Sequence, residues 1–246
     1  MKHEDMIAHA RQVMSDNDRG TYTVPTHGLY PFQWNWDSAL SALGFAQFDE
    51  PRAWTEIETL LAHQWEDGMV PHIIFHQPDD GYFPGPDVWG TGREVPTTGI
   101  TQPPVAGFAV ARIHDRARDK ALAGQKAREM LPRIHAWHQW FYRARDPQGT
   151  GLVALLHPWP FQVVDPGFNA ILIRSCEEVA DLAGRLGMTD IAEQSRAMAD
   201  KGLAAMETLW NDALSQYLCY DRKLGQQIES PSIGGILAVF AGVPTA

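Results

Sequence analysis

Two kinds of helical segment alternate along the chain, and this alternation most strongly limits the folds open to it. The first kind is long, charged and amphipathic, with apolar residues recurring about every 3.6 positions. It covers residues 3–17, 51–65, 121–144 and 190–210. The second kind is short, rich in Ala and Gly and poor in charge, and covers residues 37–48, 104–114, 166–186 and 232–242. The second kind is typical of helices covered on most sides, so the pattern predicts inner helices wrapped by outer ones.

A weak repeat indicates how these helices are arranged. Three outer helices carry a Trp near their ends, followed by a turn and a short strand-like run, over residues 63–74, 138–156 and 208–220. Repeated helix pairs of this kind predict an all-α toroid of helical hairpins with short strand-like loops. Loops at one end of the ring would then build a site. An irregular helical bundle is the alternative.

Three dipeptides are expected to start inner helices, namely Asp37-Ser38, Asp165-Pro166 and Ser230-Pro231. Asp and Ser side chains cap helix N-termini, and Pro is favoured in the first turn. We found no linker and no low-complexity segment, so residues 1–246 are expected to form a single domain.

Charge and composition exclude several classes of partner. The net charge of −10 would repel nucleic acid phosphates and anionic lipids. No apolar run reaches about 18 residues, and the N-terminal segment lacks the apolar region of a secretory signal. The two cysteines, Cys176 and Cys219, form neither a disulfide framework nor a metal motif. A cytoplasmic protein without a nucleic acid or membrane partner is therefore expected.

Aromatic residues beside polar ones form the densest cluster, at residues 30–46. Tyr30, Trp34, Trp36 and Asp37 lie at the expected start of an inner helix. Trp gives a sugar ring a flat apolar face, and a neighbouring carboxylate can accept hydrogen bonds from hydroxyls. An extended approach would turn Trp34 and Trp36 to the same side. Core tryptophans beside a capping Asp are the alternative reading.

Three further clusters precede inner helices or end the strands beside them. Tyr82 and Trp89 lie on a loop rich in Gly and Pro, Gln102 precedes two prolines, and Trp159 closes a His-Pro-Trp motif. The Gln102 amide could bind a sugar hydroxyl or satisfy the backbone. A toroid would gather all these clusters at one end, and this convergence favours a small-molecule sugar site.

Other chemistry has little support in the sequence. His72 and His76 lie four residues apart in an expected strand, without a third ligand, so no metal site is predicted. No nucleophile motif, phosphate-binding loop or cofactor motif is present.

The motifs along the chain, in order, resemble those of glycoside hydrolases of the family 63 type. The nearest branch is that of the bacterial mannosylglycerate and glucosylglycerate hydrolases. The resemblance extends from about residue 20 to the end and rests on YPFQWNWDSALSALGFA, GMVPHIIF, GYFPGPDVWG, TTGITQPPV, GLVALLHPW and DPGFNAIL. It implies an (α/α)6 barrel and metal-free hydrolysis of an α-glycosidic bond with inversion. It also implies sugar-ring contacts from Tyr30, Trp34, Trp36 and Asp37, added contacts from Tyr82 and Gln102, and Trp159 at the edge of the loop that carries the acid.

The chain departs from the family pattern in two places. In the family, His-Pro-Trp is followed by a segment like E-S-G-x-D-N-S-P, whose Asp is the general acid, and then by a helical stretch. Here the motif runs directly into residues 160–166, PFQVVDP, which resemble the far side of that stretch. The general base of the family, a Glu in a motif like G-E-G-x-G, follows the helix that corresponds to residues 232–242. The resemblance therefore assigns no catalytic residue to this chain, which is expected to be inactive alone.

The leading hypothesis is thus a shortened hydrolase-type protein with an incomplete barrel and a retained sugar subsite. A non-catalytic sugar-binding or regulatory protein is the second hypothesis, and a sugar epimerase of another toroid family is the third and weakest. An incomplete barrel would leave inner helices exposed, so self-association through its edge is expected. The choice between glucose and mannose, and the aglycone, stay open.

Overall fold

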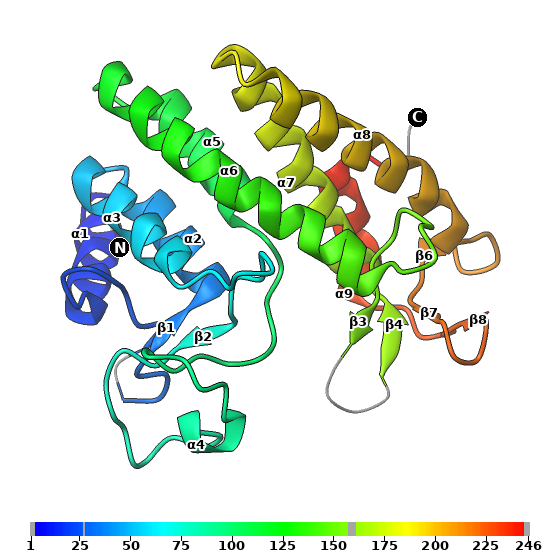
Figure 1. Cartoon of the computed structure of the whole chain (residues 1–246), viewed down its shortest axis with the longest axis horizontal. Helices are drawn as coiled ribbons and strands as arrows, with labels where there is room; N and C mark the ends of the chain where they lie inside the picture. Colours follow the sequence, from blue (N-terminus) through cyan, green and yellow to red (C-terminus); the bar gives the residue numbers. More distant parts are fainter. Residues whose placement is uncertain (1–2, 27, 157–160, 244–246) are drawn as a thin grey trace. The chain divides into compact units, whose positions relative to one another are not determined.

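The computed structural model describes residues 3–26, 28–156 and 161–243, and its described part is mainly helical (Figure 1). The residues group into two compact units. The first unit contains residues 1–102 and 109–130, and the second contains residues 103–108 and 131–246. Each unit is described below by itself.

The first unit pairs helices beside a short two-stranded sheet. Helix α2 packs against α3, and β1 pairs antiparallel with β2, with Trp34 opposite Ile73. Asp49 caps α3 by accepting a hydrogen bond from the Arg52 N–H at 3.1 Å, and Pro51 follows in the first turn. The elements of this unit are α1 (His3–Asn17), β1 (Gln33–Trp34), α2 (Asn35–Phe45), α3 (Glu50–Ala62), β2 (Ile73–Ile74) and α4 (Pro86–Trp89).

Two long helices contribute residues to both units. They are α5 (Ala106–Arg116) and α6 (Lys120–Arg145). The apolar face predicted for residues 121–144 is confirmed for five of its six residues. Ala123, Met130, Ile134, Trp137 and Phe141 are buried, and Leu122 is half-buried.

The second unit is built on the antiparallel pair α7 and α8, which lie side by side (Figure 1). Gly202 of α8 allows this close approach, because a Cβ there would lie 2.7 Å from Cγ1 of Ile173. Strands β3, β4, β7 and β8 form an antiparallel sheet in that order. The elements that begin in this unit are β3 (Leu155–Leu156), β4 (Gln162–Val164), α7 (Pro166–Arg185), α8 (Thr189–Met206), η1 (Glu207–Leu209), β5 (Trp210–Asn211), β6 (Gln216–Tyr217), β7 (Tyr220–Asp221), β8 (Gln226–Gln227), α9 (Ile233–Ile236) and η2 (Leu237–Ala241).

Of the helix starts predicted in this unit, one is confirmed and one is wrong. Asp165 caps α7 as expected, accepting a hydrogen bond from the Phe168 N–H at 2.6 Å, with Pro166 in the first turn. The start at Ser230-Pro231 is wrong, because the chain stays extended until Ser232 and α9 begins at Ile233. The helix expected over residues 232–242 is a single α-turn followed by a 3-10 segment.

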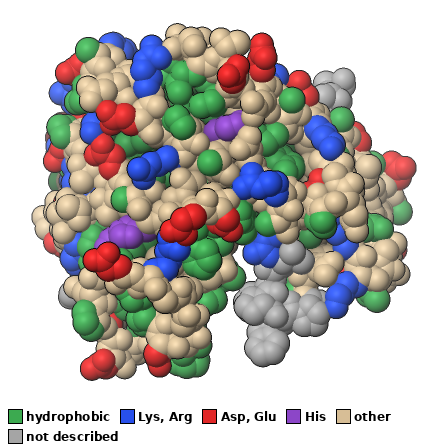
Figure 2. Space-filling model, in the orientation of Figure 1, with side chains coloured by type: hydrophobic (Ala, Val, Ile, Leu, Met, Phe, Trp, Pro, Cys, Tyr) green, Lys and Arg blue, Asp and Glu red, His purple; other side chains and the backbone are tan. Residues whose placement is uncertain are grey.

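Basic and acidic side chains intermingle on the face drawn in Figure 2. None of the described helices is long and apolar enough to cross a bilayer.

Candidate functional site

An aromatic cluster in the first unit gathers three of the predicted sugar-contact residues. The ring of Trp34 lies 5.0 Å from that of Tyr30 and 6.3 Å from that of Tyr82, edge to face in both cases. Such geometry is favourable because the positive edge of one ring meets the negative face of another. The structure thus brings together side chains that are up to 52 positions apart in the chain.

A small apolar core packs against this cluster. Phe32, Ile73 and Phe75 are buried together, and Trp34, Tyr82 and Trp89 pack against them. The pairing of β1 with β2 sets this arrangement, because it places Trp34 opposite Ile73. The aromatic rings therefore stand on a fixed base of strand residues.

The start of α2 differs from the sequence expectation. The helix begins at Asn35 and not at Asp37, so Trp36 and Asp37 lie in its first turn and Asp37 is not the cap. Contacts from far along the chain cause this early start. The Asn35 backbone N–H donates to the His72 carbonyl at 3.0 Å, and its side-chain amide donates to the Pro71 carbonyl at 3.0 Å. The extended approach expected for Trp34 and Trp36 is therefore wrong at Trp36.

Gln102 holds the first turn of α2. Its Oε1 accepts a hydrogen bond from the Trp36 backbone N–H at 3.1 Å. That N–H is one of the donors that a helix start leaves without an intrahelical partner. The sequence left two roles open to Gln102. Its oxygen has the second role, which is to accept a hydrogen bond from the backbone. Its NH2 group has no acceptor among the described residues.

Asp37 presents a half-buried carboxyl beside an exposed aromatic ring. The side chain of Trp36 is 38% exposed, so its ring is accessible. Burial raises the pKa of Asp37, while hydrogen bonds from its own backbone and from Trp36 oppose that rise. Removing a carboxylate from water is costly unless it accepts hydrogen bonds, and ligand hydroxyls can donate them.

His72 is a member of the cluster that the sequence did not assign to it. Its ring lies 4.7 Å from that of Trp34, nearly perpendicular. Burial lowers its pKa to about 4, so it is neutral at physiological pH. Its Nε2 is buried without a hydrogen-bond partner in the described part of the chain. The four-residue spacing to His76 predicts no metal site. In the structure the two rings lie in different environments, since His76 is stacked on Tyr22.

No group of three or more metal-ligating side chains occurs in residues 3–26, 28–156 and 161–243. The two cysteines in that part are free thiols.

Trp159 lies outside the described residues, and so do the other residues from 157 to 160. The strands on either side are described. β3 and β4 pair antiparallel, with Leu155 opposite Val163 and Leu156 opposite Gln162. β3 and β4 are therefore antiparallel neighbours on either side of His-Pro-Trp, and β4 leads directly into α7.

Comparisons with known proteins agree with this organisation. The family described as the mannosylglycerate hydrolase MGH1-like glycoside hydrolase domain matches residues 30–160 and 160–246. The chain is 38% identical to mannosylglycerate hydrolase MGH1 of Selaginella moellendorffii over 302 residues, which include 95% of this chain and 62% of the relative. It is 40% identical to the glucosylglycerate hydrolase of Mycolicibacterium hassiacum, over 63% of this chain and 37% of the relative.

A solved homologue confirms the fold. The family 63 mannosylglycerate hydrolase of Thermus thermophilus in complex with Tris and D-glycerate matches with a TM-score of 0.92 at 35% identity, over 98% of this chain and 74% of that one. Its complex with glucose matches with a TM-score of 0.86 at 37% identity, over 96% and 72%. The predicted all-α toroid architecture, incomplete in this chain, is thus confirmed.

The comparisons also show that this chain lacks a segment that its relatives contain. An alignment of 302 residues is longer than the 246 residues of the chain, so the relative has residues inside the aligned span without a counterpart here. The family match divides at residue 160, between β3 and β4. The chain spans 62% of the length of the Selaginella relative. It belongs to the MGH1-like glycoside hydrolase family, as a member shortened at the hairpin between β3 and β4.

Proposed function

We propose that this chain binds the sugar ring of a small α-glycoside, such as mannosylglycerate or glucosylglycerate, without hydrolysing it. The observation that carries the proposal is the cluster of Tyr30, Trp34 and Tyr82 beside the first turn of α2. Relatives with these two hydrolase names, and a homologue solved with glucose, support the choice of ligand class.

Each proposed contact has a chemical reason. The exposed rings of Trp36 and Tyr30 offer apolar faces to the C–H groups of a sugar. Asp37 supplies an acceptor for hydroxyl groups, and the NH2 group of Gln102 supplies donors. Trp34 and Tyr82 would form the sides of the sugar subsite. Trp159 is proposed to add a contact at its edge, as its motif implies.

The proposed absence of hydrolysis rests on the carboxyl groups. An inverting glycosidase needs two carboxyls about 6.5–9.5 Å apart, one donating a proton and one activating water. The acid of the family lies on the segment after His-Pro-Trp, where this chain forms the β3–β4 hairpin. Asp37 is a single carboxyl, and Asp79 is engaged in a turn with the Gly81 N–H at 2.9 Å. Neither matches the acid or the base of the family by motif.

A regulatory role that depends on this sugar binding is the second candidate. It is favoured if the subsite stays assembled although the catalytic segment is absent. The free thiols fit the cytoplasm as its place of action.

Calorimetric titration tests the proposal, after a cooperative melt has shown that the purified chain is folded. Saturable binding of either glycoside, lost in Trp36→Ala and Asp37→Ala, is the expected result. The variant Trp210→Ala, which changes a Trp on β5 outside the proposed subsite, is the matched control and should bind normally. No binding by the folded chain would overturn the proposal.

A further inference from the structure

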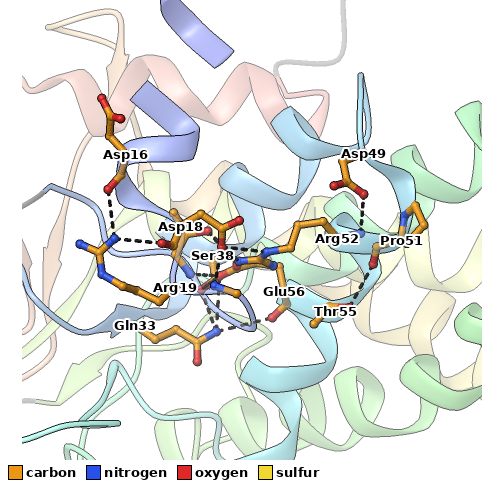
Figure 3. A network of polar contacts seen from close by, with 12 residues as sticks. Asp16, Asp18, Arg19, Gln33, Ser38, Asp49, Pro51, Arg52, Thr55 and Glu56 are labelled. Carbon is orange, nitrogen blue, oxygen red and sulfur yellow. Dashed lines mark hydrogen bonds and ion pairs between the residues drawn. The ribbon is translucent and has the colours of Figure 1, made fainter. Parts of the chain in front are cut away.

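The sugar subsite has a buried polar network behind it, centred on Glu56 of α3. Glu56 is completely buried, although an isolated carboxylate is costly to remove from water. Figure 3 shows its side chain and that of Arg52 among the residues around Ser38 and Gln33. We propose that Glu56 is a positioning residue, which fixes β1 and the first turn of α2 in the geometry that the sugar subsite requires. The inference rests on the proposed function.

One oxygen of Glu56 is used for charge balance. Its Oε2 accepts hydrogen bonds from the Arg52 guanidinium at 2.7 Å and from the Thr23 hydroxyl at 2.8 Å. Arg52 also donates to Oδ1 of Asp18 at 2.9 and 3.0 Å. Burial disfavours the charge of Arg52, but the contacts with Asp18 and Glu56 outweigh it and raise its pKa.

The other oxygen of Glu56 reaches the elements that carry the subsite. Its Oε1 accepts a hydrogen bond from the Ser38 hydroxyl at 2.6 Å, and Ser38 directly follows Asp37. The Ser38 oxygen accepts a hydrogen bond from Nε2 of Gln33 at 3.0 Å, and Gln33 directly precedes Trp34. A single carboxylate thus holds both neighbours of the Trp34–Asp37 segment.

Gln33 extends the network to a histidine. Its Oε1 lies 2.7 Å from Nε2 of His76. Since an amide oxygen can only accept, the proton of His76 lies on Nε2. Burial, with a smaller effect of the nearby His63, lowers the pKa of His76 to about 4, which keeps it in this neutral donor form. Both ends of the Gln33 amide are therefore fixed, and the side chain cannot flip without losing bonds.

A role limited to stability explains this arrangement less well. A buried ion pair is often no more stabilising than apolar residues of the same volume. Both oxygens of Glu56 are hydrogen-bonded, although Nη1 of Arg52 is buried without a partner among the described residues. A carboxylate bonded on both oxygens defines one geometry, which a sugar site needs because its groups must lie within about 0.5 Å of the bound positions.

The test uses the indole N–H signals of the tryptophans in a ¹H–¹⁵N spectrum of the full chain. Trp34→Phe and Trp36→Phe assign the two signals of interest. Ser38→Ala removes the two hydrogen bonds that the Ser38 hydroxyl makes with Glu56 and Gln33. It keeps the Glu56–Arg52 pair, so it should fold. It is expected to shift the Trp34 and Trp36 signals and to leave that of Trp137, buried in the second unit, in place. Glu56→Gln should shift the same two signals further.

Thr55→Val is the matched control. Thr55 precedes Glu56 on α3, and its hydroxyl donates to the Pro51 carbonyl, outside the network. This variant should leave the Trp34 and Trp36 signals unchanged. If Ser38→Ala lowers the melting temperature but also leaves both signals unchanged, Glu56 has only a structural role and the inference is overturned.

Binding gives a separate readout. If the unmodified chain binds a glycoside, Ser38→Ala should weaken that binding roughly three- to tenfold, which is part of the free energy of the two hydrogen bonds that it removes. The comparison is made at a temperature where both proteins are fully folded. Unchanged affinity would contradict the inference. If the unmodified chain binds nothing, the proposed function fails, while the indole signals still decide whether Glu56 positions the segment.

Discussion

The side-chain oxygen of Gln102 accepts a hydrogen bond from the backbone N–H of Trp36 at 3.1 Å, across 66 positions of sequence. This bond joins the loop before α5 to the first turn of α2. Both residues belong to the sugar subsite proposed from the sequence. Gln102 therefore fixes the helix turn that carries Trp36 and Asp37, whatever its NH2 group binds.

Replacing Gln102 separates these contributions. Gln102→Leu leaves the Trp36 N–H without its partner, which is expected to cost about 1 kcal/mol of unfolding free energy and to weaken sugar binding. Gln102→Glu keeps the acceptor and removes the NH2 donors, so it should retain stability and lose affinity alone. Chemical denaturation with calorimetry measures both quantities. Equal stability of the Leu and Glu variants would contradict the role of the oxygen.

The cap of α7 gives a second prediction. Asp165 accepts from the Phe168 N–H at 2.6 Å, and a lost cap costs about 1 kcal/mol. Asp165→Ala should lower the melting temperature by a few degrees, whereas Asp165→Asn, which can still accept, should lower it less. Thermal unfolding followed by circular dichroism provides the comparison, and indistinguishable melts of the two variants would argue against the cap.

Local sequence predicted the helices better than it predicted the site. Periodicity located most helices within a few residues, and Asp165-Pro166 marked the start of α7 correctly, because capping depends on neighbours in the chain. The start of α2 was misplaced because Asn35 bonds to Pro71, 36 positions away. His72 was missed for the same reason, since strand pairing brings it to Trp34. Long-range pairing of this kind leaves no local pattern to read.

Two half-buried histidines, His72 and His76, contribute to the way stability depends on pH. Burial lowers the pKa of both His72 and His76 to about 4, against about 6.5 in an unfolded chain. Between these values the unfolded chain binds more protons, so the free energy of unfolding falls as pH drops from about 6.5 to 4 and is fully present above 6.5. Each histidine contributes a slope of up to about 1.4 kcal/mol per pH unit.

Variants isolate this effect from the carboxyl groups that titrate in the same range. His72→Gln and His76→Gln should each reduce the slope between pH 4 and 6.5, as measured by urea unfolding at a series of pH values. If the slopes equal that of the unmodified chain, folding does not lower the pKa of these histidines.

Exposed apolar side chains on α9 and η2 bear on the expected self-association. Five are at least a third exposed, namely Ile233, Ile236, Leu237, Val239 and Phe240. Sedimentation velocity should show association that increases with concentration and is reduced in the double variant Ile236→Lys, Val239→Lys. Ile228→Lys, at an exposed apolar residue outside both segments, is the control. Association that is equal in the unmodified chain and both variants would place the contact elsewhere.

The chain is proposed to keep a sugar subsite and to lack hydrolysis. A single proton NMR time course on the purified chain, mixed separately with glucosylglycerate and mannosylglycerate, tests both halves. Saturation transfer from protein to the sugar protons, without the anomeric signals of free glucose or mannose above the buffer rate, is the predicted result. Free sugar released faster than in buffer, by a chain that loses this activity in Asp37→Ala, would contradict the account.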